Sequence, residues 1–122
     1  IHESVRPFVT RELIKRLIST EGDSIVPCIS VTSTVYYENG YLDRNKVLCV
    51  QLPQVFNTCL LKEAHRLGMG KNYTDDSSLM FYEMGIKPSF IVGLEQNIKI
   101  TTPFDVMIAE GIYNEACCCD WW

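Results

Sequence analysis

The sequence predicts a mixed α/β fold with a β-arm that projects from the sheet. Segments with apolar residues at helical spacing alternate with short apolar segments typical of strands, in the order β-α-β-arm-β-α-α-β-β-α. The arm is indicated by Asn39-Gly40 between segments of β-forming residues, which is the strongest short-range signal for a β-hairpin. Its mixed aromatic and polar surface favours an interface over a place in the core.

Composition narrows the class of protein. The 122 residues are 47% hydrophobic and 21% charged, which suits one globular unit with a sizeable core. A net charge of −4 argues against nucleic acid and anionic membrane surfaces as partners. No apolar run approaches the ~20 residues of a membrane span, and the first residues do not resemble a signal peptide. We therefore expect a soluble, cytoplasmic protein.

The first residues read as the end of a strand that runs into a polar loop. Polar side chains gather where strands stop, so Glu3 and Arg6 are candidates for a ligand site, with a surface ion pair as the alternative. An amphipathic helix over residues 10–20 is then predicted by the apolar residues Leu13, Ile14, Leu17 and Ile18. Residues 25–31 read as a buried strand, which Pro27 weakens or places near an edge.

The arm is expected over about residues 31–48. Arg44 lies at its base. Alone it reads as a solvated charge, but a guanidinium group also has the bidentate geometry that a phosphate clamp requires.

The middle of the chain predicts a strand over 47–51, a helix from Asn57 to about Leu67, and a second helix that opens at residues 74–78 and ends at Gly85. Asp75 and Asp76 would lie in the first turn of that second helix. There they could cap the helix or ligate Mg²⁺ together with phosphate, and we favour capping. His65 has no nucleophile or acid at a catalytic spacing and reads as a surface histidine. A further strand is expected at 90–92.

Residues 97–105 form the most informative stretch. Ile98 and Ile100 alternate as in a short strand, which puts Lys99 on the other face. Thr102 and Asp105 then read as a capping box with Pro at the first helical position, which predicts a helix to about Tyr113. Because anions bind near strand ends and helix N-termini, Lys99 is a candidate phosphate ligand. The alternative is an ordinary strand–loop–helix junction.

The six cysteines carry little chemistry. Cys28, Cys49 and Cys59 each lie alone in apolar surroundings. Cys117–Cys119 could be a soft-metal tract, but the sequence has no partner motif for zinc, and residues 117–122 read as an irregular tail. No residue is assigned as a metal ligand.

Five stretches together resemble a known family, and they occur in its order across nearly the whole chain. They are His2–Phe8, Leu42–Asn45, Leu52–Phe56, Thr74–Ser78 and Asn97–Pro103. They resemble the C-terminal half of the 2-C-methyl-D-erythritol 4-phosphate cytidylyltransferase (IspD) family and its relatives, the ribitol-phosphate cytidylyltransferases. The implied fold is a partial Rossmann-like nucleotidyltransferase, a three-layer α/β/α sheet over residues 1–116 that lacks its N-terminal nucleotide-binding half.

The resemblance implies a homodimeric enzyme that transfers CMP from CTP to a polyol phosphate and releases pyrophosphate, with Mg²⁺ carried by CTP. Methylerythritol phosphate, a precursor of isoprenoids, is favoured by the Leu-Asp-Arg-Asn form of residues 42–45. Ribitol phosphate and a catalytically silent binding or dimerisation module are the alternatives. Whether this chain alone is an enzyme is left open.

The same resemblance assigns roles to single residues. Lys99 would contact phosphate near the reacting centre, and Arg6 and Thr34 would hold the polyol phosphate. Arg44 would reach the active site of the partner subunit, so Lys99, Arg6 and Arg44 are the catalytic candidates. Glu3 and Asn97 are expected on the substrate side.

The sequence also departs from the family. Glu3 stands where the family usually has Asp, Ser33 where Asp is usual, and Leu52 in place of a substrate-binding threonine. A Gly-x-Gly-type phosphate loop is missing from the sequence, so we expect a fragment of a longer enzyme.

Overall fold

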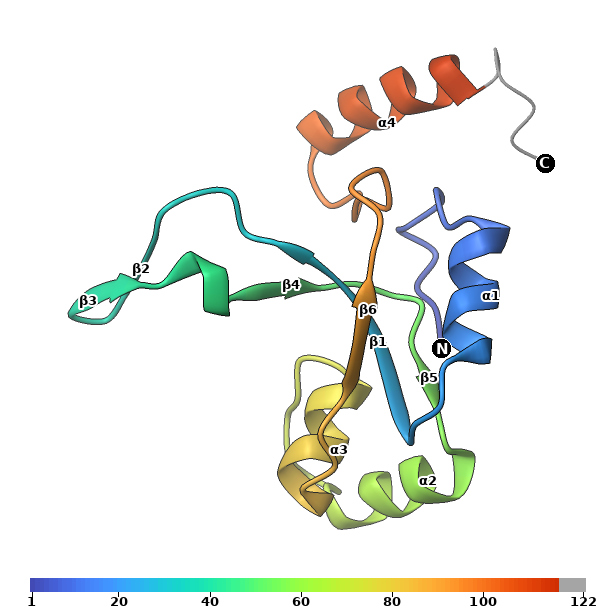
Figure 1. Ribbon diagram of the computed structural model, residues 1–122, viewed down its shortest axis with the longest axis vertical. Coiled ribbons are helices and arrows are strands. Elements are labelled where there is room, and N and C mark those ends of the chain that lie inside the picture. Colours follow the sequence, from blue (N-terminus) through green and yellow to red (C-terminus); the bar gives the residue numbers. More distant parts are fainter. Residues whose placement is uncertain (117–122) are drawn as a thin grey trace.

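The computed structural model describes residues 1–116, and it confirms the mixed α/β class (Figure 1). The elements are α1 (Arg11–Ser19), β1 (Ser24–Ser30), β2 (Val35–Tyr37), β3 (Gly40–Leu42), the 3₁₀ helix η1 (Arg44–Lys46), β4 (Leu48–Val50), β5 (Val55–Phe56), α2 (Thr58–Leu67), α3 (Asp76–Met84), β6 (Ser89–Val92) and α4 (Pro103–Ala116). The predicted tail at 117–122, with its three cysteines, lies outside the described residues. Within residues 1–116, no helix is long and apolar enough to cross a membrane.

Strand β1 is the centre of the main sheet. It pairs in parallel with β6 on one side, where Cys28 lies opposite Val92. On the other side it pairs antiparallel with β4, where Cys28 lies opposite Val50, and with β5, where Ile25 lies opposite Val55. The chain between β4 and β5, residues 51–54, therefore interrupts the ladder on that side.

The expected edge position of Pro27 is wrong. Pro27 lies in the middle of the central strand and pairs with Ile91 of β6. Its carbonyl accepts a hydrogen bond from the Gln51 N–H (2.8 Å), so its nitrogen faces the interruption between β4 and β5. A proline has no N–H to donate, and here the ladder has a gap where that donor would have been needed.

Two predicted strand segments are loops. Residues 97–101 have no strand assignment, and Ile100 makes a single backbone hydrogen bond there, to the carbonyl of Val5 (2.8 Å). Residues 1–8 are also irregular, although Ile1 exchanges two backbone bonds with Gln54 in the manner of one strand pair. Within the described chain, neither segment has a neighbouring strand along its length.

The predicted helix starts and the predicted end at Gly85 are confirmed, but α4 runs to Ala116, beyond the predicted end at about Tyr113. Thr10 caps α1 and Asn57 caps α2, each through a side-chain oxygen that accepts a backbone N–H. Asp75 and Ser78 form a capping box at α3, and Gly85 ends that helix with φ 68°. At α4, Asp105 accepts from the Thr102 N–H (2.7 Å) and the Thr102 hydroxyl oxygen accepts from the Asp105 N–H (3.2 Å), which is the predicted reciprocal cap.

The core has two hydrophobic clusters. In the first, Leu13 and Leu17 of α1 pack on Ile25 of β1. In the second, Ala64 of α2 packs on Leu79 and Met80 of α3. The helical pattern over 10–20 overstated the buried face of α1, because Ile14 is half-exposed and Ile18 is 70% exposed in the chain.

The arm consists of β2 and β3 and projects from the body of the molecule (Figure 1). Tyr37 pairs with Gly40, so the two loop residues are Glu38 and Asn39, and Glu38 takes the left-handed conformation (φ 51°). The hairpin is thus confirmed, but its tight turn begins one residue before Asn39-Gly40. Tyr36 and Tyr41 pack edge-to-face across it, and both rings are largely exposed.

Candidate functional site

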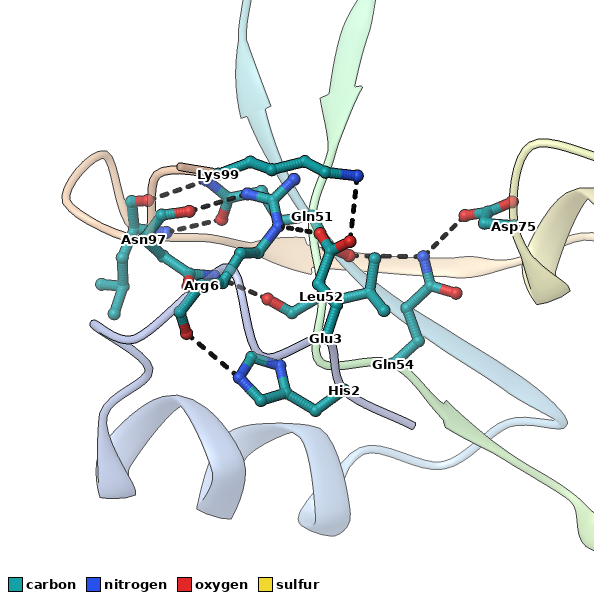
Figure 2. Close-up of polar contacts among 10 residues, drawn as sticks. His2, Glu3, Arg6, Gln51, Leu52, Gln54, Asp75, Asn97 and Lys99 are labelled. Atoms are coloured by element: carbon teal, nitrogen blue, oxygen red, sulfur yellow. Dashed lines mark hydrogen bonds and ion pairs between the residues drawn. The ribbon is translucent and has the colours of Figure 1, made fainter. Parts of the chain in front are cut away.

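A cluster of three charged side chains forms where the N-terminal loop meets the loop before α4. The Glu3 carboxylate accepts from the Arg6 Nε at 2.6 Å through one oxygen, and its other oxygen lies 2.9 Å from the Lys99 Nζ (Figure 2). The structure therefore brings together residues from opposite ends of the described chain. We call Glu3, Arg6 and Lys99 the charged cluster.

Backbone contacts hold the N-terminal half of this cluster in place. The Arg6 N–H donates to the Glu3 carbonyl (3.2 Å), which closes a turn that puts both side chains on the same side. The pairing of Ile1 with Gln54 fixes the segment before the turn, and the pairing of Val5 with Ile100 fixes the segment after it. These backbone hydrogen bonds, on both sides of the turn, therefore hold Glu3 within ion-pair distance of Lys99.

Asn97 joins the two loops through its side chain and its backbone. Its side-chain amide donates to the Leu52 carbonyl (2.7 Å), and its backbone carbonyl accepts from Arg6 Nη1 (2.7 Å). The side chain is fully buried, and its Oδ1 has no hydrogen-bond partner among the described residues. In this structure Asn97 supports Arg6, and its predicted contact with substrate stays a prediction.

The electrostatics of the cluster leave a surplus of positive charge. Burial raises the pKa of Glu3, but the hydrogen bonds from Lys99 and Arg6 outweigh it and hold that pKa below its ordinary value. The carboxylate is therefore ionised at neutral pH between two cations. The Arg6 side chain is mostly buried, whereas the Lys99 side chain is 48% exposed, so Lys99 presents the excess charge to solvent.

The structure places Arg44 and Thr34 elsewhere. Thr34 is exposed just before β2, and Arg44 in η1 donates through Nη1 to the Thr32 carbonyl (2.7 Å). Both belong to the arm, and among residues 1–116 no hydrogen bond or ion pair joins either of them to the charged cluster of the same chain. A residue that acts in a partner subunit would have this placement, and the roles of Arg44 and Thr34 stay predictions.

The described residues do not fit a resident Mg²⁺ ion. No group of three or more His, Cys, Asp or Glu side chains converges in residues 1–116. Both oxygens of Glu3 are engaged by cations. Mg²⁺ stays a prediction, as an ion that arrives with the nucleotide.

Asp75 and Asp76 serve the structure of α3, as the capping interpretation predicted. Asp75 accepts from the Gln54 side chain (2.7 Å) as well as from Ser77 and Ser78. Burial raises the pKa of Asp75, but these hydrogen bonds outweigh it and the pKa is lowered. Asp76 pairs with His65 of α2 (2.8 Å), so this histidine joins two helices at the surface.

Two glutamines near the cluster had no place in the sequence prediction. Gln51 and Gln54 are buried, and each uses its side-chain amide to bind another segment of the chain (Figure 2). Their signal in the sequence is weak: two amides flank Leu52-Pro53 at the end of a β-rich segment. A buried amide needs partners, but the sequence does not say which.

Comparison with known proteins now decides the family. The model of the family "IspD: 2-C-methyl-D-erythritol 4-phosphate cytidylyltransferase" matches residues 1–115. The chain belongs to this family. The resemblance predicted from five short stretches is thereby confirmed.

Individual relatives agree with this assignment. The chain is 40% identical over 118 residues to the 2-C-methyl-D-erythritol 4-phosphate cytidylyltransferase of Bacteroides fragilis, a match that covers 92% of this chain and 53% of that protein. It is 37% identical over 121 residues to the enzyme of the same name from Bacillus velezensis, covering 92% of this chain and 52% of that protein.

Solved structures share the fold. The cytidylyltransferase of Thermus thermophilus matches with a TM-score of 0.84 and 30% identity, over 93% of this chain and 60% of that one. A 4-diphosphocytidyl-2C-methyl-D-erythritol synthase from Anaerococcus prevotii matches with a TM-score of 0.82 and 28% identity, over 93% of this chain and 55% of that one. The chain thus spans about half the length of the curated relatives it matches and somewhat more of these structures.

Proposed function

We propose that this chain forms the polyol-phosphate side of a site that transfers CMP from CTP to 2-C-methyl-D-erythritol 4-phosphate and releases pyrophosphate, in the synthesis of isoprenoid precursors. The observation that carries this proposal is the charged cluster, in which one carboxylate holds two cations and leaves a net positive charge. Membership of the cytidylyltransferase family supplies the reaction type and the substrates.

The proposed reaction needs positively charged side chains beside the substrate phosphate. An oxygen of the substrate phosphate attacks the α-phosphorus of CTP, and the bond from that phosphorus to the oxygen bridging to the β-phosphate breaks, so pyrophosphate leaves. A phosphate monoester carries about −1.5 to −2 charge at pH 7. A lysine ammonium fixed beside it lowers the repulsion between two anionic reactants and stabilises the charge that develops in the transition state.

Lys99 is the cation that can change partners. Its ion pair with Glu3 is partly exposed, and such pairs contribute about 0–1 kcal/mol. An arriving phosphate can therefore take up the ammonium at little cost. Arg6 differs, because its Nε and Nη1 are committed to Glu3 and to the Asn97 carbonyl, so it holds the anion and the loop in place.

In this proposal the arm forms the contact with a second subunit. Tyr36, Tyr37 and Tyr41 expose most of their surface in a single chain. Aromatic residues are enriched at protein interfaces, and a projecting hairpin can exchange with a second copy. Arg44 and Thr34 of the arm would then approach the charged cluster of the partner subunit, and the substrate phosphate would contact groups of both chains.

The proposal is tested by pyrophosphate release from CTP with the complete gene product. We expect release with 2-C-methyl-D-erythritol 4-phosphate and a lower kcat/KM with ribitol phosphate. A higher kcat/KM with ribitol phosphate would show that ribitol phosphate is the preferred acceptor in the same type of reaction. No release with either acceptor would contradict the enzyme and support a silent binding or dimerisation module.

A further inference from the structure

The side chain of Gln51 behaves as a piece of β-strand backbone. Its Nε2 donates to the Leu94 carbonyl (2.8 Å), and its Oε1 accepts from the Leu94 N–H (3.1 Å). One amide thus satisfies both backbone polar groups of one residue, as a neighbouring strand would. Gln51 is 3% exposed, so water does not replace these bonds in the structure.

Asn97 makes the reciprocal contact. Its Nδ2 donates to the carbonyl of Leu52, the residue after Gln51, while the Gln51 amide binds Leu94, near the start of the loop that carries Asn97. Each segment therefore lends one amide side chain to the backbone of the other. We call these contacts of Gln51 and Asn97 the amide clamp.

The clamp crosses the central strand. Cys28 of β1 pairs with Val50 on one side and Val92 on the other, so Gln51 and Leu94 follow strands that β1 separates. The crossing leaves little room at position 93, where an added Cβ would lie 2.3 Å from the Gln51 Oε1 and 3.2 Å from the Cys28 carbonyl oxygen, so the Gln51 amide would have to move. The Gly93 N–H also donates to the Cys28 carbonyl (2.8 Å), which holds this peptide against the sheet.

Leu94, the residue that the amide clamp holds, anchors the loop that carries Lys99. The Leu94 carbonyl accepts from the Asn97 N–H (3.1 Å) as well as from Gln51, so it closes the turn at residues 95–96. The Asn97 carbonyl then accepts from Arg6, and two residues later Lys99 meets Glu3. A shift of Leu94 would move the Arg6 contact and the Lys99 ammonium together.

We infer that Gln51 is a positioning residue for Lys99: through Leu94 it sets where the loop leaves the sheet, and so where the ammonium meets the phosphate. This inference rests on the proposed function for its effect on catalysis. Its structural part, that Gln51 fixes residues 93–100, can be measured without any substrate.

The chain offers a matched control in Gln54. This glutamine is equally buried and comes from the same segment, but its side chain binds Asp75 and the Gln51 carbonyl. In the part of the chain that the structure describes, it has no hydrogen bond to residues 93–100. A general loss of stability would follow from either Gln51→Leu or Gln54→Leu. A loosened Lys99 loop follows only from Gln51→Leu.

The first measurement is backbone hydrogen exchange of the complete gene product. Gln51→Leu is expected to speed exchange in residues 93–100 while exchange in α1 and α2 stays slow, and Gln54→Leu is expected to leave 93–100 protected. Equal exchange at 93–100 in both variants would overturn the inference. Because this readout needs no turnover, it decides the inference even if the protein releases no pyrophosphate, a result that would contradict the proposed function alone.

The second measurement is steady-state pyrophosphate release. Displacing a catalytic group by about 1 Å can lower kcat by about 100-fold. Gln51→Leu should therefore reduce kcat by up to that factor, whereas Gln54→Leu should keep the kcat of its folded fraction. An unchanged kcat for folded Gln51→Leu would contradict the effect on Lys99.

The Gln51→Glu variant should recover the contact with Leu94 when its new carboxyl group is protonated. A protonated carboxyl group has one donor and one acceptor, as this contact requires, whereas the carboxylate has no donor for the Leu94 carbonyl. Burial raises the pKa of a carboxyl group, so the kcat of Gln51→Glu relative to the unmodified protein should rise as the pH falls toward ~6. A ratio that does not change with pH would contradict the role of the clamp and leave Gln51 a purely structural residue.

Discussion

Lys99 lies 2.9 Å from the carboxylate of Glu3, although the two residues come from opposite ends of the described chain. The same carboxylate holds Arg6, whose guanidinium reaches back to the loop of Lys99 through the Asn97 carbonyl. The Glu3 carboxylate therefore holds the two cations close together. Each oxygen of this carboxylate binds a different cation.

The Glu3 carboxylate should make stability depend on pH in a defined direction. Its pKa is lower in the folded chain than the ordinary 4.5, because the bonds from Lys99 and Arg6 outweigh burial. Its contribution is therefore complete above pH 4.5 and is lost as the pH falls through the lower folded value. Glu3→Gln should lower the free energy of unfolding by about 1 kcal/mol at neutral pH, and this difference should shrink in acid.

Denaturant unfolding over a pH series measures that difference. Glu21→Gln is the matched control, because Glu21 is an exposed residue in the loop after α1. A Glu3→Gln difference that stays constant from neutral to acidic pH would show that the charge of Glu3 does not stabilise the fold.

The close approach of Gly93 to Gln51 predicts a coupled pair of substitutions. Gly93 is not among the glycines with positive φ, but an added Cβ would lie 2.3 Å from the Gln51 Oε1. Gly93→Ala should therefore destabilise by about 1–3 kcal/mol through overpacking. In the double variant Gln51→Ala/Gly93→Ala the clash with the Gln51 side chain is removed and only the 3.2 Å approach to the Cys28 carbonyl oxygen remains, so the total loss should be less than the sum of the two single losses.

Urea unfolding of the four proteins in this cycle gives the coupling energy. Gly111→Ala is the control, because a Cβ at that position of α4 meets nothing within 4 Å among the described residues. Additive losses for Gln51 and Gly93 would contradict the close contact on which the amide clamp depends.

Asp105 should stabilise the start of α4 through its charge. Its carboxylate accepts from the backbone N–H and hydroxyl groups of Thr101 and Thr102, with the Thr101 N–H the largest cause, and these bonds lower the pKa of Asp105 from 3.8 to about 2. Because the folded pKa is depressed, the stabilisation is present above pH 3.8 and is lost as the pH falls through about 2.

Asp105→Asn should therefore speed amide exchange in the first turn of α4 near neutral pH, with a difference from the unmodified protein that fades toward pH 2. Glu110→Gln, in the exposed middle of the same helix, should have no such effect. Equal exchange in Asp105→Asn and the unmodified protein at neutral pH would show that these bonds contribute nothing to the helix.

The sequence predicted elements whose signals are local. The reciprocal cap of Thr102 and Asp105, the cap of α3 at Asp75 and the hairpin around Asn39 each depend on residues within a few positions of one another. The residues that make these contacts are close in the sequence, so a local pattern can identify them.

Features that depend on distant partners could not be predicted in this way. Ile98 and Ile100 alternate as strand residues do, but the pattern does not say whether a neighbouring strand exists, and none runs beside them in residues 1–116. Pro27 reads as an edge residue unless the interruption between β4 and β5 is known. Gln51 binds a residue 43 positions further along the chain, a separation at which composition and spacing carry no signal.

The resemblance to the family selected candidate site residues that the structure brings together only in part, and their roles stay predictions. Glu3, Arg6, Asn97 and Lys99 were selected from motifs at opposite ends of the chain, and the structure places them together. Gln51 and Gln54 could not be selected in this way, because the partners of their side chains lie 43 and 21 positions further along the chain.

The role proposed for Arg44 predicts complementation between two inactive proteins. Arg44 donates to the Thr32 carbonyl within the arm and, in the described residues, makes no hydrogen bond or ion pair with the charged cluster of its own chain. If it acts across the dimer, Arg44→Ala and Lys99→Ala should each lose activity, but a mixed dimer should contain one site with both residues intact. Pyrophosphate release should therefore reappear when the two variants are co-expressed.

The mixed dimer can be isolated with two affinity tags, and each variant dimer serves as the control. Release no greater than that of the separate variants would mean that Arg44 serves its own chain or has no part in the reaction.

The most direct test of the charged cluster is the rate of pyrophosphate release by Lys99→Ala in the complete gene product. The account predicts a fall in kcat of about 100-fold or more at saturating CTP, with the free energy of unfolding nearly unchanged because the side chain is half exposed. Lys62→Ala, which removes an exposed lysine from α2, should keep the full rate. A Lys99→Ala protein that releases pyrophosphate as fast as Lys62→Ala would contradict the account.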